Sequence, residues 1–333
     1  MAGNTSLTRA YNRIFTIMRD EAIEPYLFDN ISSRTALLYC LKEKGAIKKV
    51  GGTPHLRFNI LKELPTTDGY SDLDVITPVR ADPVTSAIYD WKQLQCPVQV
   101  SGLDMIKTGD EAAPDLLEMF IQAAEISMRD AIGGSSVGIF SSGADTDTNK
   151  ITGLQTHFTS STTTGQVGNI SRATLTAWRH QSANVSSAFD TNGLARMRTL
   201  YRQCSRADET PDIVVLNGST WDNFNAELSG TFHTNMPLSD VGAGSKAMLD
   251  AGFPNLRWFG ASLFHDDGVP ANVGYFLNSD YVQLYVREGR DAEISDFIKS
   301  TDKDDLVAFV FWAGNLINKN LARGGVLLNS DTY

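Results

Sequence analysis

Apolar residues recur every three or four positions in four stretches of the chain, which is the spacing of one face of a helix. The first stretch, Asn4–Arg19, predicts a short amphipathic helix. The second predicts a helix over Ser33–Lys44 that Gly45 ends, with Ser32 or Ser33 at its N-cap. Both are too short to be stable alone in water, so we expect them to lie against the body of the chain or against another copy.

The third stretch predicts the longest helix, Thr108–Ile132, which Gly133 ends. Thr108 and Glu111 have the spacing of a capping box, and Pro114 falls in the early turns. About twenty residues at roughly 1.5 Å each give a rod of about 30 Å, enough to form the backbone of one domain.

The fourth stretch begins a helix–strand–helix sequence. It predicts a helix over Thr191–Arg206, with Leu200 and Cys204 on its inner face. The apolar run Ile213–Leu216 predicts a short buried strand. Ser219 with Asp222 can cap the turn of helix that follows.

Residues 46–103 differ in kind, because prolines and glycine turns interrupt the β-prone runs Leu56–Leu61 and Val98–Val100. The pattern predicts a long, irregular excursion that leaves the body and returns. A hairpin of this size cannot bury itself. It therefore either packs on the body as a loop-rich β subdomain or projects as an arm, and the pattern favours neither.

Ser, Thr, Gly and Asn dominate residues 135–187, where apolar islands predict strands or short helices between polar loops. A glycine-rich loop is expected at Gly230–Gly244. The rest of the chain holds β-prone runs separated by turn residues: Leu256–Phe259, Ser262–Phe264, Val273–Leu277, Tyr281–Val286, Leu306–Trp312, Leu316–Ile317 and Gly325–Leu328. This order of elements predicts an α+β fold.

The composition is that of an ordinary globular protein, with 333 residues of which 42% are hydrophobic and 20% charged. A net charge of −10 would repel nucleic-acid phosphates, which disfavours sequence-specific DNA binding. Arg9, Arg13, Arg19 and Asp20 interrupt the apolar residues of the first twenty positions, so we predict no secretion signal. No later stretch approaches 18 apolar residues, so we predict no membrane span. Cys40, Cys96 and Cys204 lie far apart without metal-ligand spacing, which disfavours zinc and disulfides and favours a reducing compartment.

The common enzyme fingerprints, such as GxGxxG, the P-loop, HExxH and GxSxG, are missing. His265, Asp266 and Asp267 could ligate a divalent metal if a third group converged on them. A turn at the end of a strand is the favoured interpretation. Asp145 and Asp147 lack the loop spacing of a calcium site, so we expect them in a solvated loop.

His157 and His180 lie beside aromatic residues, where a packed or surface histidine is commoner than a catalytic one. Cys204 lies among arginines that could lower the pKa of its thiol, but the helical register places it inside with Leu200. We therefore assign no catalytic, cofactor-binding or metal-binding residue and no cofactor, and we predict that the chain is not an enzyme.

The stretch Gly252–Asp291 begins Gly-Phe-Pro-Asn-Leu-Arg-Trp-Phe-Gly, passes through an acidic turn to Pro270, and continues with Tyr275-Phe-Leu-Asn278. This order resembles the late region of the major capsid proteins of tailed bacteriophages with the HK97 fold. Pro211–Trp221 is similar to the strand and short helix that enter the axial domain of that family, and Phe309–Leu328 to the closing strands of its peripheral domain. The matching order covers nearly the whole chain.

The resemblance implies an HK97-like α+β capsid fold in five parts. These are an N-terminal arm (1–45), an extended loop (46–103), a spine helix with the peripheral domain (104–210), an axial domain (211–300) and a return to the peripheral domain (301–333). In the family the extended loop lies across a neighbouring subunit, which would bury its apolar residues between chains. The loop Gly230–Gly244 would form the mobile tip of the axial domain.

The implied function is that of a major capsid protein, which self-assembles into pentamers and hexamers of an icosahedral shell enclosing phage double-stranded DNA. The implied location is the virion capsid, after assembly in the bacterial host cytoplasm. The net charge agrees, because a container for packed DNA should bind its contents weakly. The expected partners are other copies of the chain, a portal protein and decoration proteins, with no membrane.

Two family features are only partly matched. Residues 1–45 are too short for the long scaffolding segment that some members carry, so a separate scaffolding protein is implied. Lys62 is a lysine in the loop from which other members form a crosslink to an asparagine, but no partner residue is identified and no crosslink is predicted.

Two other classes of function stay open. An encapsulin-like compartment shares the fold and would hold a cargo enzyme instead of DNA. A metal-dependent hydrolase that uses His265, Asp266 and Asp267 would be a monomer or small oligomer with a bound metal.

Overall fold

The computed structural model describes residues 35–65, 67–72, 82–186, 188–229, 256–299 and 303–330, without the side chains of 104–117 and 228–229. The predicted helix Asn4–Arg19 and the loop Gly230–Gly244 lie outside the described residues. The chain divides into two compact units. Of the described residues, Gln95–Met128 and Ala292–Phe311 form unit 1, and the others form unit 2.

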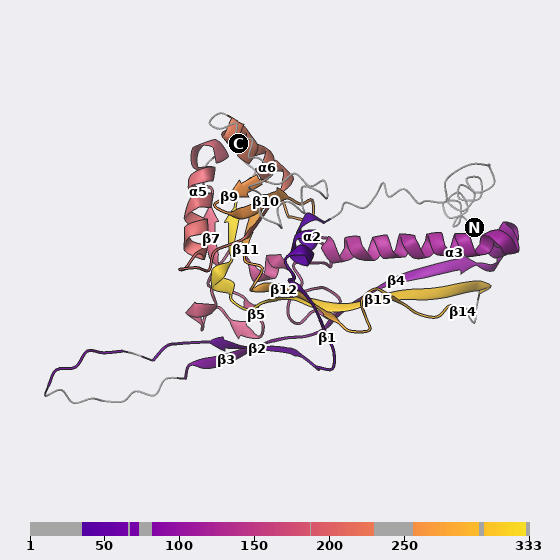
Figure 1. The fold of residues 1–333 in the computed structure, drawn as a ribbon, viewed down its shortest axis with the longest axis horizontal. Coiled ribbons are helices and arrows are strands. Elements are labelled where there is room, and N and C mark those ends of the chain that lie inside the picture. Colours follow the sequence, from indigo (N-terminus) through magenta and orange to yellow (C-terminus); the bar gives the residue numbers. More distant parts are fainter. Residues whose placement is uncertain are drawn as a thin grey trace. The chain divides into compact units, whose positions relative to one another are not determined.

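One sheet of unit 2 has six strands in the order β7-β16-β11-β8-β10-β9, of which β7, β11, β10 and β9 are labelled in Figure 1. Their bounds are Gln181–Asn184 (β7), Gly325–Leu328 (β16), Val273–Leu277 (β11), Ile213–Leu216 (β8), Ala261–His265 (β10) and Leu256–Trp258 (β9). Strand β8 lies inside the sheet between β11 and β10, and all four of its residues are buried. The apolar run at this position predicts this burial, which is therefore confirmed.

Two helices pack on this sheet, α5 (Phe189–Cys204) on β7 and β16 and α6 (Gly218–Ser229) on β10. The inner face of α5 is as predicted, because Leu200 and Cys204 are fully buried. The predicted cap of the second helix is wrong. Asn217, directly after β8, accepts a hydrogen bond at its side-chain oxygen from the Thr220 amide at 2.9 Å, so the helix begins before Ser219.

A second sheet is built around β15 (Asp305–Asn318), which continues from unit 1 into unit 2. Its other strands are β1 (Ile47–Val50), β12 (Val282–Arg287), β13 (Glu293–Ile294), β14 (Ile298–Lys299) and β4 (Lys92–Ser101). Within unit 2, β1 pairs in parallel with β12, and β12 pairs antiparallel with β15. Gly314 and Asn315 do not divide β15 into the two predicted strands, because β12 keeps pairing with both residues.

The longest helix, α3 (Gly102–Gly133), begins six residues before the predicted start at Thr108. The Ser101 hydroxyl accepts a hydrogen bond from the Leu103 amide at 3.3 Å, which caps the earlier start. Thr108 therefore lies inside the helix, and the predicted capping box is wrong. The end at Gly133 is confirmed, and Ala124 and Met128 of the predicted apolar face are buried.

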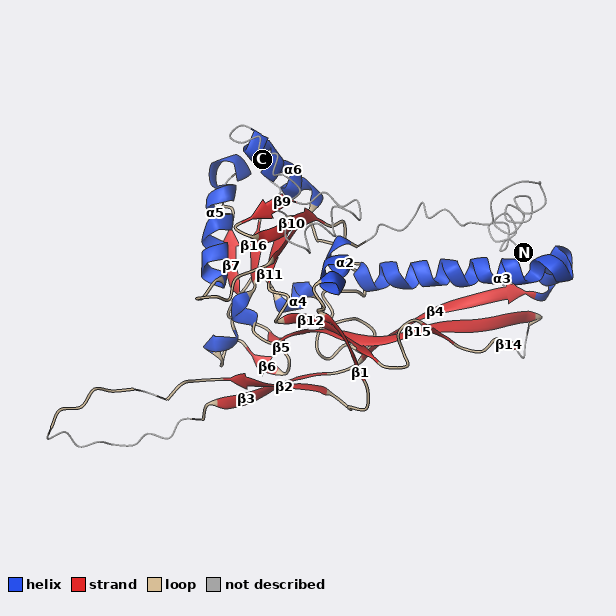
Figure 2. Cartoon of the chain, viewed as in Figure 1, coloured by secondary structure: helices blue, strands red, loops and turns tan. Residues whose placement is uncertain are grey.

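Helix α2 (Ala36–Glu43) is shorter than predicted at its start, and Gly45 with φ +67° follows its end as expected. Residues 135–186 form turns and short elements, as predicted (Figure 2). These elements are α4 (Leu154–His157), β5 (Gln166–Val167), β6 (Ile170–Ser171), a 3₁₀ turn at Thr176–Trp178 and the strand β7 already described. A second 3₁₀ turn lies at Leu321–Arg323. The predicted α+β class is confirmed.

Candidate functional site: an exposed hairpin and its root

The excursion predicted over residues 46–103 contains a two-stranded hairpin in unit 2 (Figure 1). Strand β2 (Leu56–Leu61) pairs with β3 (Val84–Tyr89), from Leu56 opposite Tyr89 to Leu61 opposite Val84. Among the described residues, these strands pair only with each other. Their outer edges carry no further strand, although the Ile88 amide near the inner end of β3 donates to the Gly168 carbonyl at 3.0 Å. Strand β2 has the predicted bounds, whereas β3 has no counterpart among the predicted runs.

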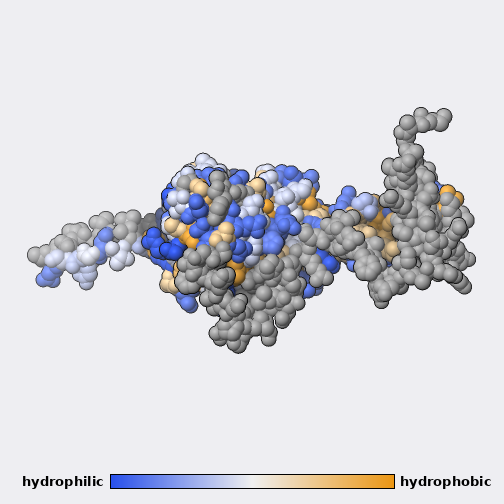
Figure 3. All heavy atoms as spheres, turned by 90° about the horizontal axis from the view of Figure 1, so that it is seen from above, coloured by the Kyte–Doolittle hydropathy of each residue, from blue (hydrophilic) through white to orange (hydrophobic). Residues whose placement is uncertain are grey.

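The outer half of the hairpin exposes large apolar side chains. Leu61 is 56% exposed, Leu64 71% and Tyr70 75%. Hydrophilic residues predominate on the described surface seen in Figure 3, with apolar residues scattered among them. An isolated two-stranded ribbon is marginally stable in water, and its open edges are templates for pairing with another chain. This hairpin therefore has the chemistry of a surface that a second chain covers, which favours the projecting arm over the packed subdomain.

The inner half of the hairpin is held by aromatic contacts. The Phe58 ring meets the Tyr285 ring edge to face at 5.5 Å between centroids. The Lys319 ammonium lies 5.3 Å from the Phe58 centroid and 5.8 Å from that of Tyr285, within cation–π range. The Tyr89 hydroxyl donates to the Asn318 carbonyl at 2.9 Å. These contacts fix the inner half to β12 and to the end of β15.

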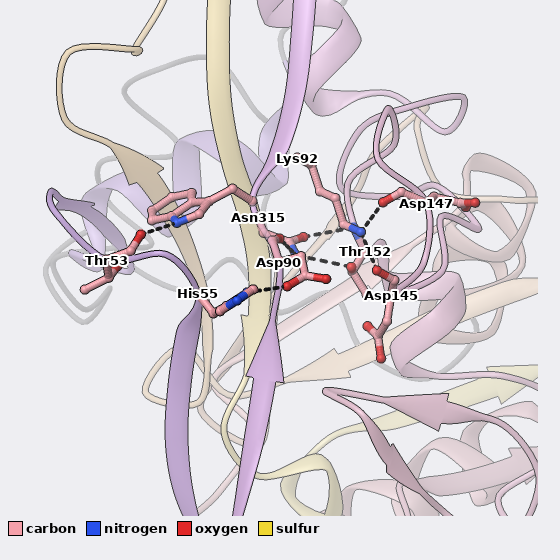
Figure 4. A network of polar contacts seen from close by, with 9 residues as sticks. Thr53, His55, Asp90, Lys92, Asp145, Asp147, Thr152 and Asn315 are labelled. Carbon is pink, nitrogen blue, oxygen red and sulfur yellow. Dashed lines mark hydrogen bonds and ion pairs between the residues drawn. The ribbon is translucent and has the colours of Figure 1, made fainter.

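A polar network surrounds the point where the chain returns from β3 (Figure 4). The Asn315 side-chain amide donates to the Asp90 carbonyl at 2.8 Å, and His55 pairs with the Asp90 carboxylate at 2.7 Å. The Trp91 indole donates to the Thr53 carbonyl at 2.9 Å. The buried Lys92 ammonium donates to main-chain carbonyls of the loop Ala144–Asp147. We call Thr53–His55 before β2 and Asp90–Lys92 after β3 the root of the hairpin. These contacts fix the root on the side of both strands.

His157 and His180 lie in a buried cluster around the cation of Arg172. The Arg172 guanidinium is fully buried and donates to the carbonyls of Thr156 and His157 at 2.6 and 2.7 Å. Burial, with the charge of Arg172 adding to it, lowers the pKa of His157 to about 3 and that of His180 to about 4. Both imidazoles are therefore neutral and enclosed, as the packed interpretation expects, and neither is open to a substrate.

In the acidic turn at His265, Asp266 and Asp267, the Asp266 carboxylate binds the start of helix α2. Asp266 is buried and accepts hydrogen bonds from the Leu37 amide and the Gly268 amide, each at 2.9 Å. Burial raises the pKa of Asp266 to about 6. Asp267 is exposed. Among the described residues, no group of three or more His, Cys, Asp or Glu side chains is arranged to hold a metal ion.

Two other predicted candidates also have structural roles. The Asp147 carboxylate accepts a hydrogen bond from the Ala144 amide at 2.8 Å and so closes its own loop. Asp145 accepts one from the Asn169 amide at 3.2 Å. Burial raises the pKa of the Cys204 thiol to about 12, so this cysteine belongs to the core and is not an activated nucleophile.

The sequence reasoning missed the residues that hold the root, namely Asp90, Lys92 and Asn315. Asn315 interrupts an otherwise apolar run, and a buried amide in such a run indicates a specific hydrogen-bonded role. Lys92 carries no comparable mark, because its environment comes from a loop more than fifty residues away in the chain.

No family model matches the chain, and no curated protein matches its sequence. Solved structures do match. The cyanophage A-1(L) capsid asymmetric unit aligns with a TM-score of 0.71 and 17% identity, over 95% of this chain and 98% of that one. The capsid of the empty GTA particle aligns with a TM-score of 0.65 and 13% identity, over 94% and 95%. The capsid of Myoviridae phage XM1 aligns with a TM-score of 0.58 and 10% identity, over 93% and 96%.

These alignments span nearly the full length of both chains. The chain therefore has the HK97-like fold of phage capsid proteins, and the fold that the resemblance implies is confirmed. Within the described residues, no helix is long and apolar enough to cross a membrane.

Proposed function

We propose that this chain is a major capsid protein, which self-assembles into pentamers and hexamers of an icosahedral shell enclosing phage double-stranded DNA. The observation that carries the proposal is the match to the cyanophage A-1(L) capsid over 95% of this chain. The match also covers 98% of the other chain.

The hairpin supports the same function. Its exposed apolar side chains and open edges require a covering partner, and a neighbouring copy in a closed shell supplies one at every position. The root network supports it too, because an arm that reaches a neighbour must leave its own subunit in a defined direction. We propose a structural, non-enzymatic role.

The proposal extends to partners and location. A separate scaffolding protein and a portal protein would take part in assembly, and decoration proteins could bind the finished shell. The mature protein would lie in the virion capsid after assembly in the host bacterial cytoplasm. A net charge of −10 supports weak contact with the enclosed DNA, because tight phosphate binding would oppose packaging and release.

The test is electron microscopy of the full chain beside sizing chromatography at low and high salt, with and without a scaffolding partner. Closed icosahedral shells, or five-fold and six-fold rings, are the expected result. A uniform small oligomer under every condition would overturn the proposal. Nuclease-protected DNA in the shells is expected from particles made during infection, and a single co-purifying protein in its place would indicate a cargo compartment.

A further inference from the structure

Lys92 is a charged residue in a position that normally excludes charge. It is the first residue of β4, directly after the turn that leaves the hairpin, and it is 1% exposed. Its ammonium donates to the carbonyl of Asp145 at 2.6 Å, to that of Ala144 at 3.3 Å and to that of Asp147 (Figure 4). An ammonium has three N–H donors, so main-chain oxygens satisfy all of them.

The three carbonyls come from one short loop, Ala144–Asp147, which bends around the ammonium. Loops that bind hard cations such as calcium or potassium present main-chain carbonyl oxygens in the same way, with carboxylates close by to supply negative charge. Burial lowers the pKa of Lys92, and the carboxylates of Asp145, Asp90 and Asp147 oppose this shift by stabilising the charged form. One side-chain oxygen of Asp145 is buried and has no hydrogen-bond partner among the described residues.

The residues on either side of Lys92 fix the same part of the chain. Asp90 and Trp91 are bonded to Asn315 and Thr53, and the Gln93 amide donates to the Thr148 carbonyl at 3.3 Å. Among these residues, the buried side chain of Lys92 joins the strand that returns from the hairpin to the loop Ala144–Asp147.

We propose that the Lys92 ammonium is a tethered cation, occupying an oxygen cage that would otherwise take a cation from solution, and that it thereby positions the root of the hairpin. The cage consists of the main-chain carbonyls of Ala144, Asp145 and Asp147. Without the ammonium, these oxygens face one another with no positive charge between them, and the loop opens. This proposal concerns one chain, so it stands or fails separately from shell assembly.

The test uses the full-length chain with Lys92→Ala. This substitution removes three methylenes and the ammonium. n-Propylammonium supplies three carbons and an ammonium in their place. n-Propanol is the matched neutral control, because it fills the same space without the charge. Calcium chloride and potassium chloride test whether the cage accepts an inorganic cation. The wild type and Lys92→Met, which keeps an apolar stem, are measured in the same chelator-treated buffer.

The first measurement is the thermal unfolding midpoint. We expect n-propylammonium to raise the midpoint of Lys92→Ala by about 2–4 °C, with no rise for the wild type or Lys92→Met and none from n-propanol. Equal rescue by n-propanol would mean that Lys92 contributes only the packing of its stem. No rescue by propylammonium, calcium or potassium would overturn the cage itself.

The second measurement is hydrogen exchange at the Gln93 amide, which reports the root directly. We expect faster exchange in Lys92→Ala and restored protection when the cage is filled by propylammonium. Unchanged exchange in the variant would contradict the positioning role. If Lys92→Ala yields no soluble protein, the yield on refolding with propylammonium is compared with the yield on refolding with propanol, and equal yields would overturn the proposal.

Discussion

The carboxylate of Asp266 accepts a hydrogen bond from the backbone amide of Leu37 at 2.9 Å, although the two residues are 229 positions apart. Leu37 lies in the first turn of α2, where backbone amides lack partners within the helix. Thr35, the N-cap residue, forms no capping hydrogen bond with its side chain. Asp266, which follows β10, therefore accepts the hydrogen bond that the side chain of an N-cap residue normally accepts. Helix α2 begins at this contact.

Replacing Asp266 tests this distant cap. We expect Asp266→Ala to lower the free energy of unfolding by about 1–2 kcal/mol, because the buried Leu37 amide and the half-buried Gly268 amide lose their acceptor. Urea unfolding of the subunit gives the value. Asp267→Ala is the matched control, since Asp267 is its exposed neighbour, and it should change stability by less than about 0.5 kcal/mol. Equal effects of the two variants would contradict the capping role.

Acidification should destabilise the subunit through the buried histidines. Below the unfolded-state pKa of about 6.5, the unfolded chain takes up protons that His157 and His180 in the folded state cannot, so stability falls with pH. The loss ends near the folded pKa values, about 3 and about 4. Asp266 acts in the opposite direction between about pH 6 and its model-peptide value near 3.8, because the folded state binds the extra proton.

His180→Gln isolates one of these contributions. Between about pH 6.5 and pH 5, each histidine accounts for a loss of about 2 kcal/mol. Urea unfolding at the two pH values should therefore show a drop that is smaller by about that amount in the variant than in the wild type. An identical drop in both proteins would show that His180 does not contribute to the loss of stability at low pH.

The exposed hairpin residues should matter to assembly and not to the subunit. We expect the double substitution Leu64→Ser and Tyr70→Ser to change unfolding free energy by less than about 0.5 kcal/mol. Shell yield by electron microscopy should fall strongly, because the covered apolar area between chains is lost. Thr67→Ser, on the same part of the hairpin, is the control and should assemble normally. Normal shells from the double variant would show that these side chains remain uncovered.

Gly153 should not tolerate a side chain. A Cβ at this position would lie 2.0 Å from the Ser141 carbonyl oxygen and 2.6 Å from its nitrogen, and neither backbone atom can turn away. We expect Gly153→Ala to cost more than about 3 kcal/mol, through overpacking and a displaced backbone. Gly218→Ala is the control, because a Cβ there meets nothing within 4 Å, and its stability should be unchanged or higher. Equal melting temperatures for both variants would contradict this packing.

Local pattern predicted the elements whose cause is local. The burial of β8 follows from four consecutive apolar residues, and the inner face of α5 follows from the spacing of Met197, Leu200 and Cys204. The starts of α2 and α3 do not follow from local pattern. Asp266 caps one helix from a distant strand end, and the Gly102 amide at the start of the other is bonded to the Asp304 carbonyl at 2.8 Å.

The candidate site divides in the same way. The excursion and its turn residues were visible in the sequence, because prolines and glycines interrupt the β-prone runs. The root was not visible, because Lys92 meets Ala144–Asp147 and Asp90 meets Asn315 only after folding. Asp266 and Asp147, which we considered as metal ligands and assigned to turns or loops, each bind a backbone amide: Asp266 caps a helix and Asp147 closes its own loop.

The open edges of β2 and β3 set a limit on how much free subunit a cell can hold. Two hairpins can pair edge to edge in a wrong register, and the frequency of such encounters rises with the square of subunit concentration. Incorporation of a subunit at the growing rim of the proposed shell scales with the first power of subunit concentration when the number of rims is fixed. Slow synthesis, or a protein that covers the hairpin until docking, therefore improves the yield of correct product without any change in the stability of the subunit.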